Sequence, residues 1–210
     1  MSVDLKDIEL FKNDLPEDVI LEGDLAIDTE TMGLNLHRDR LCLVQISDTT
    51  GRIFLIQFDP KSNYNAPNLK KFLLNEKIVK IFHFARFDVA MLNKHFGIEM
   101  KNIFCTKIAS KLSRTYTDYH GLKDLCRELI AVNISKAQQS SNWGAVELTD
   151  LQKIYAANDV VYLHSIRDKL TEYLDSLGRL DVAEACFGFI NMRAKLDLIG
   201  WNDKDIFAHH

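Results

Sequence analysis

The sequence of 210 residues lacks the features that mark several large classes of protein. No apolar run is long enough to span a bilayer, because Asp, Glu or Lys interrupts the longest ones. Residues 1–19 are acidic and contain neither the basic nor the apolar region of a secretory signal. The sequence also has no internal repeats, low-complexity tracts or linkers rich in Pro, Gly or Ser. We therefore expect a cytoplasmic protein with no membrane partner.

Cysteine pairs and an excess of positive charge are missing as well. The sequence has no CxxC pair, and its four cysteines are widely separated: Cys42, Cys105, Cys126 and Cys186. We therefore expect buried free thiols and neither zinc nor a disulfide framework. The formal net charge of −4 argues against a protein that coats long nucleic acid with a broad basic face. It is compatible with a protein that binds a few phosphates through metal ions and local cations.

The hydrophobic pattern predicts a single α/β domain with a mixed sheet. Apolar runs rich in β-formers predict strands at 24–31, 41–48, 51–59 and 77–83, the first three antiparallel. Apolar spacing of three to four residues predicts helices at 66–76, 85–97, 103–113, 120–130, 149–178 and 180–200. Gly97 is expected to end one helix, and Thr149 with Gln152 to cap the start of another. The polar, non-periodic segment 133–147 is the best candidate for a functional loop.

Two carboxylates, Asp28 and Glu30, follow the apolar residues of LAIDTETMGL (25–34). On a strand they project from the same face, about 7 Å apart along the backbone. Unpaired, they repel each other and lose hydration. A polar edge strand is the ordinary explanation for such a pair, but the preceding Leu-Ala-Ile indicates a buried strand. A divalent cation would make this arrangement favourable.

Two further acids occupy positions where ligands often gather. Asp88 lies in the first turn of a predicted helix after an apolar strand that ends near His83. An acid that interacts with the helix dipole is the alternative explanation for Asp88. Tyr155 and Asp159 are four residues apart and share an apolar helix face. A structural Tyr–Asp hydrogen bond is the alternative for that pair. Together, four acids and a tyrosine fit phosphoryl chemistry with two Mg²⁺ or Mn²⁺ ions.

The three stretches DTE, HxAxxD and YxxxD resemble the exonuclease motifs of the DEDD superfamily, and the tyrosine places the chain in its DEDDy branch. That branch includes ribonuclease D and the proofreading domains of DNA polymerases. The resemblance covers about residues 22–175. It implies a ribonuclease H-like exonuclease fold, in which a mixed central sheet is flanked by helices. We expect one domain over 1–210, with a C-terminal helix at about 180–200 packed on the core or on a partner subunit.

The resemblance also implies roles for individual residues. The metal ligands would be Asp28, Glu30, Asp88 and Asp159, with Asp28 bridging both ions. Tyr155 would position the attacking water. Leu34, with Met32 beside it, matches a leucine that wedges between bases, and the 3′ hydroxyl would be bound near Thr29 and Glu30. His83, Gln139 and Trp143 are candidate substrate contacts, although His83 and Trp143 are equally compatible with core positions.

Within the ribonuclease D-like family, TETMGLNLHRDRLCLVQIS looks most like the nanoRNase C (NrnC) group. Only about 35 residues follow the resembling region, too few for the helical RNA-binding domains of ribonuclease D. The implied function is 3′–5′ exonucleolytic cleavage of very short RNA, dinucleotides above all, to nucleoside 5′-monophosphates. The alternatives are trimming of longer RNA, a DNA exonuclease of the same branch, or a non-catalytic nucleic-acid-binding domain. The presence of all five motif residues argues against the last.

Two surface features complete the expectations. The C-terminal helix carries many apolar residues for a peripheral segment, and the resemblance implies a ring-like homo-oligomer. The apolar and soft residues concerned are Cys186, Phe187, Phe189, Ile190 and Met192. The basic residues of two clusters are expected to face solvent, or alternatively to line the path of a 5′ phosphate; they are Arg38, Arg40, Lys107, Lys111 and Arg114.

Overall fold

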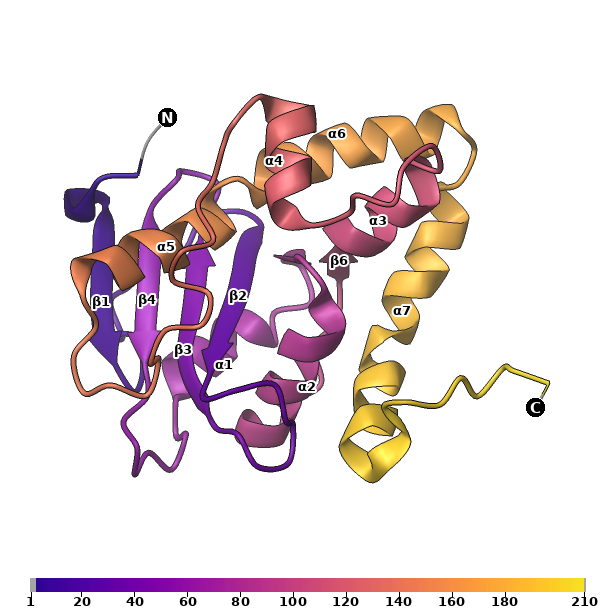
Figure 1. The fold of residues 1–210 in the computed structure, drawn as a ribbon. Helices are drawn as coiled ribbons and strands as arrows, with labels where there is room; N and C mark the ends of the chain where they lie inside the picture. The colour runs from indigo at the N-terminus through magenta and orange to yellow at the C-terminus, as the bar shows by residue number, and fades with distance from the viewer. Residues whose placement is uncertain (1–2, 210) are drawn as a thin grey trace.

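The computed structural model describes residues 3–209, which form a six-stranded mixed sheet with helices on both faces (Figure 1). The strand order is β1-β4-β3-β2-β5-β6. The strands are β1 (Ile8–Lys12), β2 (Leu25–Thr31), β3 (Leu41–Ser47), β4 (Ile53–Gln57), β5 (Lys80–Phe82) and β6 (Ile103–Cys105). The pairs β2–β3 and β3–β4 are antiparallel, as predicted, and the other three pairs are parallel.

The helices agree largely with the sequence pattern. They are α1 (Pro67–Leu73), α2 (Ala85–Phe96), α3 (Thr106–Ser113), α4 (Leu122–Ile130), α5 (Asp150–Val161), α6 (Leu163–Ser176) and α7 (Leu180–Leu196). The short elements η1 (Leu5–Asp7) and η2 (Asp197–Trp201) complete the set. Gly97 ends α2 in the left-handed conformation, and Thr149 forms the predicted capping box with Gln152. None of the helices within residues 3–209 is long and apolar enough to cross a membrane.

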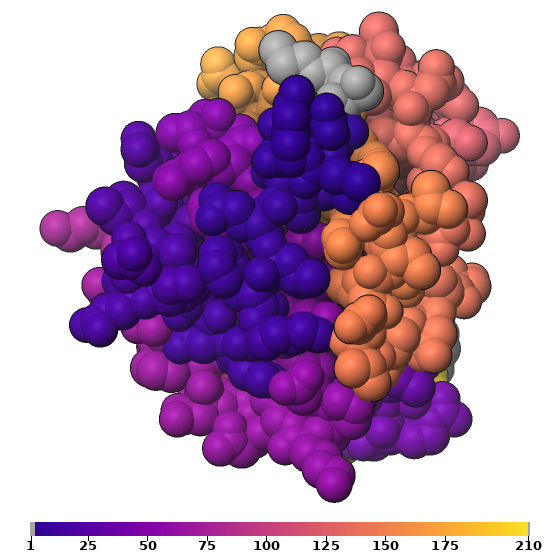
Figure 2. All heavy atoms as spheres, turned by 90° about the vertical axis from the view of Figure 1, so that its left-hand side faces the viewer, coloured from indigo at the N-terminus to yellow at the C-terminus, as the bar shows by residue number. Residues whose placement is uncertain are grey.

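Both faces of the central strands are buried, which explains why β3 and β4 are mostly apolar. One face packs against α5, where Ala26 and Leu43 meet Ala156 and Val160. The opposite face packs against α1 and α2 in the larger core cluster. Figure 2 shows the α5 segment (orange) beside the N-terminal segment (indigo), in keeping with a hydrogen bond from Lys12 Nζ to the Val146 carbonyl.

The structure divides the predicted helix 149–178 into α5 and α6 at Tyr162, where ψ is −9°. The two halves have different packing partners. α5 lies across β2, β3 and β4, whereas α6 packs against α3 and α4 (Figure 1). The break lets one apolar stretch serve both surfaces. Apolar spacing alone could not reveal it, because the spacing continues through the break.

Two strands escaped the sequence analysis, and both lie at edges of the sheet. β6 has only three residues, so the expected helix at 103–113 actually begins at Thr106. β1 is mostly exposed and therefore lacks the apolar run of a central strand. The cysteines agree better with expectation: all four are free and three are buried, with Cys186 half-buried.

Arg114 contradicts the expectation that the basic clusters face solvent. Its side chain is fully buried at the end of α3, with none of its surface exposed. It donates to Ser110 Oγ and to the Tyr119 carbonyl, and it pairs with Glu128. A guanidinium can be buried when its donors are satisfied in this way. Arg114 therefore holds the segment between α3 and α4 to the core.

α7 packs against α2, α3 and β6 of its own chain. This contact buries Phe187 and Ile190, so only part of the predicted apolar face remains at the surface. Phe189 contacts Phe207 of the C-terminal tail, with ring centroids 5.8 Å apart. Met192 stays about half exposed. Phe187 and Ile190 of the C-terminal helix therefore pack on the core of the same chain.

Candidate active site

A pocket of about 340 Å³ lies at the carboxyl end of β2, where the two helix layers meet the edge of the sheet. All four predicted acids and Tyr155 line it. Asp28 and Glu30 continue the face of β2 that carries Ala26, and that face is covered by α5. α5 contributes the third acid, Asp159, and Tyr155 one turn before it. The fold therefore brings the four acids and Tyr155, from β2, α2 and α5, to one pocket.

Three of the acids are close enough to share an ion. Carboxylate oxygens of Asp28, Glu30 and Asp159 all lie within 4.8 Å of one another. Asp88 is not a member of this group and reaches the pocket from the other layer, in the first turn of α2. The Thr29 hydroxyl, on the opposite face of β2, donates to Asp88 Oδ1 at 2.6 Å. Thr29 therefore fixes the fourth acid relative to the other three.

Burial and mutual repulsion make it unfavourable to ionise these acids together. The pKa of Glu30 rises from 4.5 to about 9, first through burial and then through the charges of Asp159 and Asp88. Burial is also the largest cause for Asp88 and Asp159, whose pKa values rise to about 7. The pKa of Asp28 is raised well above its usual value for the same reasons. A donor set made only of carboxylate oxygens fits hard divalent cations, which would neutralise this repulsion.

Gln45 is a contributor that the sequence analysis did not single out. It lies directly opposite Asp28 in the β2–β3 register, and its Nε2 donates to Asp28 Oδ2 at 3.2 Å. The side chain is fully buried, and its Oε1 has no hydrogen-bond partner among residues 3–209. Burial of an amide is costly unless it forms a hydrogen bond. The bond to Asp28 therefore offsets part of the cost of burying Gln45. The signal was available, because Gln45 interrupts an apolar strand that pairs with the DTE strand.

Tyr155 packs against Trp143, with ring centroids 5.9 Å apart and ring planes at 44°. Trp143 is only 3% exposed and does not line the pocket, so its position agrees with the core alternative. It supports Tyr155 from behind. Burial, and then the charge of Asp159, raises the pKa of Tyr155. The tyrosine hydroxyl therefore keeps its proton and acts as a hydrogen-bond donor.

The predicted substrate contacts divide into two groups. Those that line the pocket are Thr29, Leu34, His83 and Gln139. Met32 does not line it and instead lies against Gly144, where a Cβ would be 2.1 Å from the Met32 sulfur. Their roles in substrate binding stay predictions.

The loop that carries Leu34 is held firmly although its side chain is 83% exposed. Asp39 is buried and accepts hydrogen bonds from the backbone of Asn35 and the side chain of Arg38. A Cβ on Gly33 would lie 2.5 Å from Asp39 Oδ2, so glycine is needed for close approach. Leu34 is therefore an exposed apolar side chain on a fixed support at the mouth of the pocket.

A hydrogen-bond chain sets the tautomer of His83. Thr106 Oγ1 donates its one proton to the Phe82 carbonyl at 3.1 Å, because a carbonyl can only accept. His83 Nδ1, 2.9 Å from the same hydroxyl, must then supply the second proton. Burial and the charges of Lys107 and Lys136 lower the pKa of His83 to about 3. His83 is therefore neutral, with Nε2 as an acceptor.

Comparison with known proteins places this geometry in a family. A family model described as 3′-5′ exonuclease matches residues 7–175. Ribonuclease D of Gluconacetobacter diazotrophicus is 32% identical over 157 residues, which cover 75% of this chain and 39% of that protein. DNA polymerase I of Aquifex aeolicus is 34% identical over 153 residues, 73% of this chain and 24% of that protein. The chain thus spans well under half the length of these curated relatives.

Solved structures show similarity over nearly the whole chain. Brucella melitensis NrnC is 53% identical, with a TM-score of 0.93, and the match covers 97% of this chain and 98% of that one. NrnC has also been solved with bound pGG, at 53% identity and a TM-score of 0.92. A further structure contains bound Mg²⁺, at 52% identity and a TM-score of 0.92. This chain therefore belongs to the 3′–5′ exonuclease family and has the ribonuclease H-like fold that its DEDDy motifs predicted.

Proposed function

We propose that the protein is a 3′–5′ exoribonuclease that cuts very short RNA, dinucleotides above all, into nucleoside 5′-monophosphates. The observation that carries the proposal is the group of Asp28, Glu30 and Asp159 oxygens within 4.8 Å of one another. Tyr155 lines the same pocket. Such a group is unfavourable without cations and is what metal-assisted phosphodiester hydrolysis requires.

The cofactors would be two divalent cations, Mg²⁺ or Mn²⁺. Asp28, Glu30 and Asp159 would hold them, together with Asp88 from α2. When bound, the ions would lower the pKa of the attacking water and stabilise the charge on the leaving oxygen. Mg²⁺ bound to Brucella NrnC supports this choice of metal.

The protein's own residues would orient the reactants. Tyr155 keeps its proton and would hold the attacking water in line with the phosphate through its hydroxyl. Thr29 and Gln45 hold the carboxylates of Asp88 and Asp28, so little reorganisation is needed when the ions bind. Leu34, on its fixed loop, would separate the two bases of the substrate. His83 Nε2 would accept a hydrogen bond from the substrate, and the Gln139 amide could form hydrogen bonds with it.

Several features support a short substrate. The cations that line the pocket are few, namely Lys107, Lys123 and Lys136, and the chain as a whole carries a net charge of −4. A protein that binds long RNA by its backbone gains affinity from many cations along a path, which this composition does not favour. Brucella NrnC binds pGG, a short ligand, which agrees with this reading. Trimming of longer RNA is therefore the less favoured alternative. We also propose that the protein acts in the cytoplasm as a ring-like homo-oligomer.

The substrate proposal can be tested with end-labelled RNAs of two, three, five and twenty nucleotides in Mg²⁺. We expect the fastest turnover on the dinucleotide and no turnover in EDTA. Equal or faster turnover of the 20-mer would overturn the dinucleotide preference while leaving the exonuclease assignment.

The site assignment has its own test. Asp28→Ala should abolish turnover with the fold retained, because it removes the carboxylate shared by both ions. Asp150→Ala is a matched control, since Asp150 is an exposed acid in the first turn of α5 that pairs with Lys153. If Asp28→Ala retained a tenth of wild-type activity, the two-ion assignment would be wrong.

A further inference from the structure

Phe84 has a backbone conformation that bulky residues rarely adopt. It directly precedes α2 with φ 66° and ψ 45°, in the left-handed region, and its side chain makes no capping hydrogen bond. A β-carbon is strained there, and such strain persists mainly where the surrounding structure or the function requires it. The Phe84 side chain is nevertheless 44% exposed, so burial in the core does not explain it.

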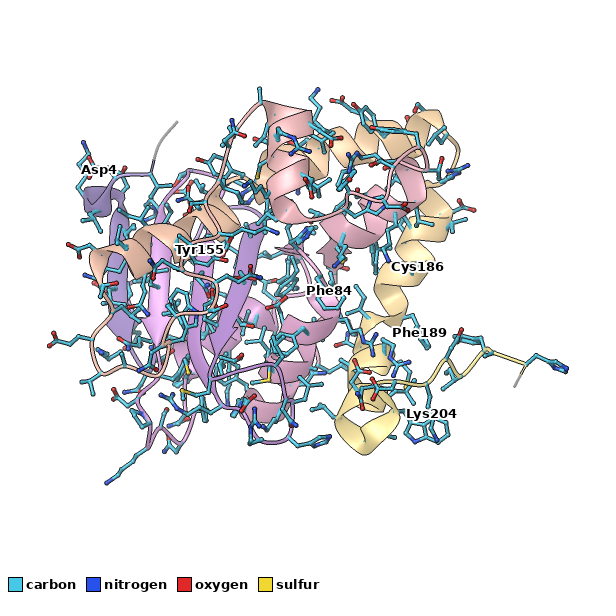
Figure 3. All side chains as sticks on the ribbon, in the orientation of Figure 1. Asp4, Phe84, Tyr155, Cys186, Phe189 and Lys204 are labelled. Carbon is cyan, nitrogen blue, oxygen red and sulfur yellow. The ribbon has the colours of Figure 1, made fainter. Side chains whose placement is uncertain are left out.

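The position of the ring offers an explanation. Phe84 lines the active-site pocket together with His83 and Asp88. It also lines a hollow of about 530 Å³ that includes Leu34, and a larger one of about 730 Å³ between α3 and α7. In the view of Figure 3, Phe84 lies between Tyr155 of α5 and Cys186 of α7. An exposed aromatic ring therefore stands at the edge of the active site, where the three hollows meet.

The charges around Phe84 show which end of the substrate it faces. Lys107 Nζ lies 4.4 Å from the centre of the Phe84 ring, as in a cation–π contact. Lys107 lines the active-site pocket together with Phe84, as do Lys123 and Lys136. Phe84 therefore lies beside the cations that line the pocket.

We propose that Phe84 is the stacking platform for the base of the substrate's 5′ nucleotide, which rests on the proposed function. The acids and their cations must hold the scissile phosphate, and the lysines attract any phosphate on the 5′ side. The 5′ nucleoside then lies between the scissile phosphate and Lys107, across Phe84. Leu34 lines the same pocket, so a base would be held between an aromatic ring and an apolar side chain.

Variants at position 84 separate the ring from the strained backbone. Phe84→Ala should raise KM for dinucleotides about 5-fold to 150-fold, as expected for loss of one base–aromatic stack, with kcat changed by less than about 2-fold. Phe84→Tyr should restore most of this loss. Phe84→Gly should show the same KM as Phe84→Ala but melt about 2–4 °C higher, because glycine accepts the left-handed backbone. Tyr173→Ala, which removes a similarly exposed ring on α6, is the control and should leave KM unchanged.

Modified substrates identify the base concerned. A dinucleotide that lacks its 5′ base should raise the wild-type KM to the level of Phe84→Ala and should affect that variant no further. A substrate that lacks its 3′ base should lower the activity of wild type and variant by equal factors. If Phe84→Ala raised KM for the substrate that lacks its 5′ base but not for the substrate that lacks its 3′ base, the assignment to the 5′ nucleotide would be wrong. Unchanged KM in Phe84→Ala would overturn the stacking role itself.

A binding measurement distinguishes this proposal from the proposed function. A dinucleotide with 2-aminopurine at the 5′ position should lose fluorescence when it binds wild-type protein in Ca²⁺, and should lose less with Phe84→Ala at saturation. If wild type cleaves dinucleotides but quenches no better than the variant, only the stacking proposal fails. If wild type neither cleaves nor binds dinucleotides, the proposed substrate is wrong and the stacking proposal falls with it.

Discussion

Replacing Asp88 with asparagine should make the metal-free protein more stable at pH 8, although it removes a predicted ligand. The pKa of Asp88 rises from 3.8 to about 7 in the folded protein, so the folded state holds this proton more tightly than the unfolded state. Well below pH 4 both states are protonated and the shift has no effect. Between about pH 4 and pH 7 the unfolded state loses this proton while the folded state keeps it, so stability falls as the pH rises, and the loss levels off above pH 7 where both states are ionised. The asparagine side chain does not titrate, so the variant should escape this loss.

The size of the effect follows from the shift. A rise of about 3 pKa units lowers the stability of the wild type by about 4 kcal/mol at pH 8 and by about 1.7 kcal/mol at pH 5. Between these pH values Asp88→Asn should therefore gain about 2.5 kcal/mol on wild type, or about 5–10 °C in melting temperature for a chain of this size. The amide oxygen of asparagine can still accept the Thr29 hydrogen bond, so little packing is lost.

Thermal melts in EDTA at pH 5, 6.5 and 8 provide the assay, with Asp150→Asn as the control for loss of an exposed acid. Saturating Mg²⁺ should reverse the order at pH 8, because binding to the folded state raises the melting temperature of wild type more than that of the variant. Parallel pH profiles for wild type and Asp88→Asn in EDTA would refute the claim that this buried carboxyl destabilises the metal-free fold.

Three further substitutions test individual contacts. Tyr155→Phe should lower kcat by about 10²-fold to 10⁴-fold with little change in KM, measured by dinucleotide turnover. Gln45→Met should lower activity or Mg²⁺ affinity by about 10-fold to 100-fold, because Asp28 loses its buried donor; the Mg²⁺ concentration for half-maximal rate checks this. Arg114→Met should destabilise the fold by about 2–4 kcal/mol in urea unfolding, since the Tyr119 carbonyl loses its partner and Glu128 is left paired with Arg127, while the KM of the refolded enzyme stays unchanged.

The parts of the site that depend on one local element could be predicted from the sequence. Asp28 and Glu30 share a face because strand side chains alternate, and Tyr155 and Asp159 share one because they are four apart on a helix. The family resemblance then indicated that the two elements meet. Gln45 required knowledge of the strand register, since only the pairing of β2 with β3 places it opposite Asp28.

Other features depend on tertiary contacts that leave little trace in the sequence. From the sequence, Arg114 is expected at the surface. Its burial depends on tertiary contacts with Glu128 of α4 and with the Tyr119 carbonyl. The left-handed backbone at residue 84 could not be predicted, because the residue there is phenylalanine and not glycine or asparagine. Both cases involve a residue type used against its usual preference. Such positions are where sequence patterns fail and where a functional or structural requirement has to be sought.

The small residues of YAAND connect the fold to the chemistry. Ala156 and Ala157 lie on α5 and are fully buried, in the cluster formed with Ala26 and Leu43 of the sheet. Because these side chains are small, α5 can lie close to β2. The neighbouring Tyr155 and Asp159 are then close to the carboxylates at the end of that strand. The break at Tyr162 serves the same purpose, because it frees α5 from the packing direction of α6. The acid cluster therefore depends as much on two alanines and a helix break as on the acids themselves.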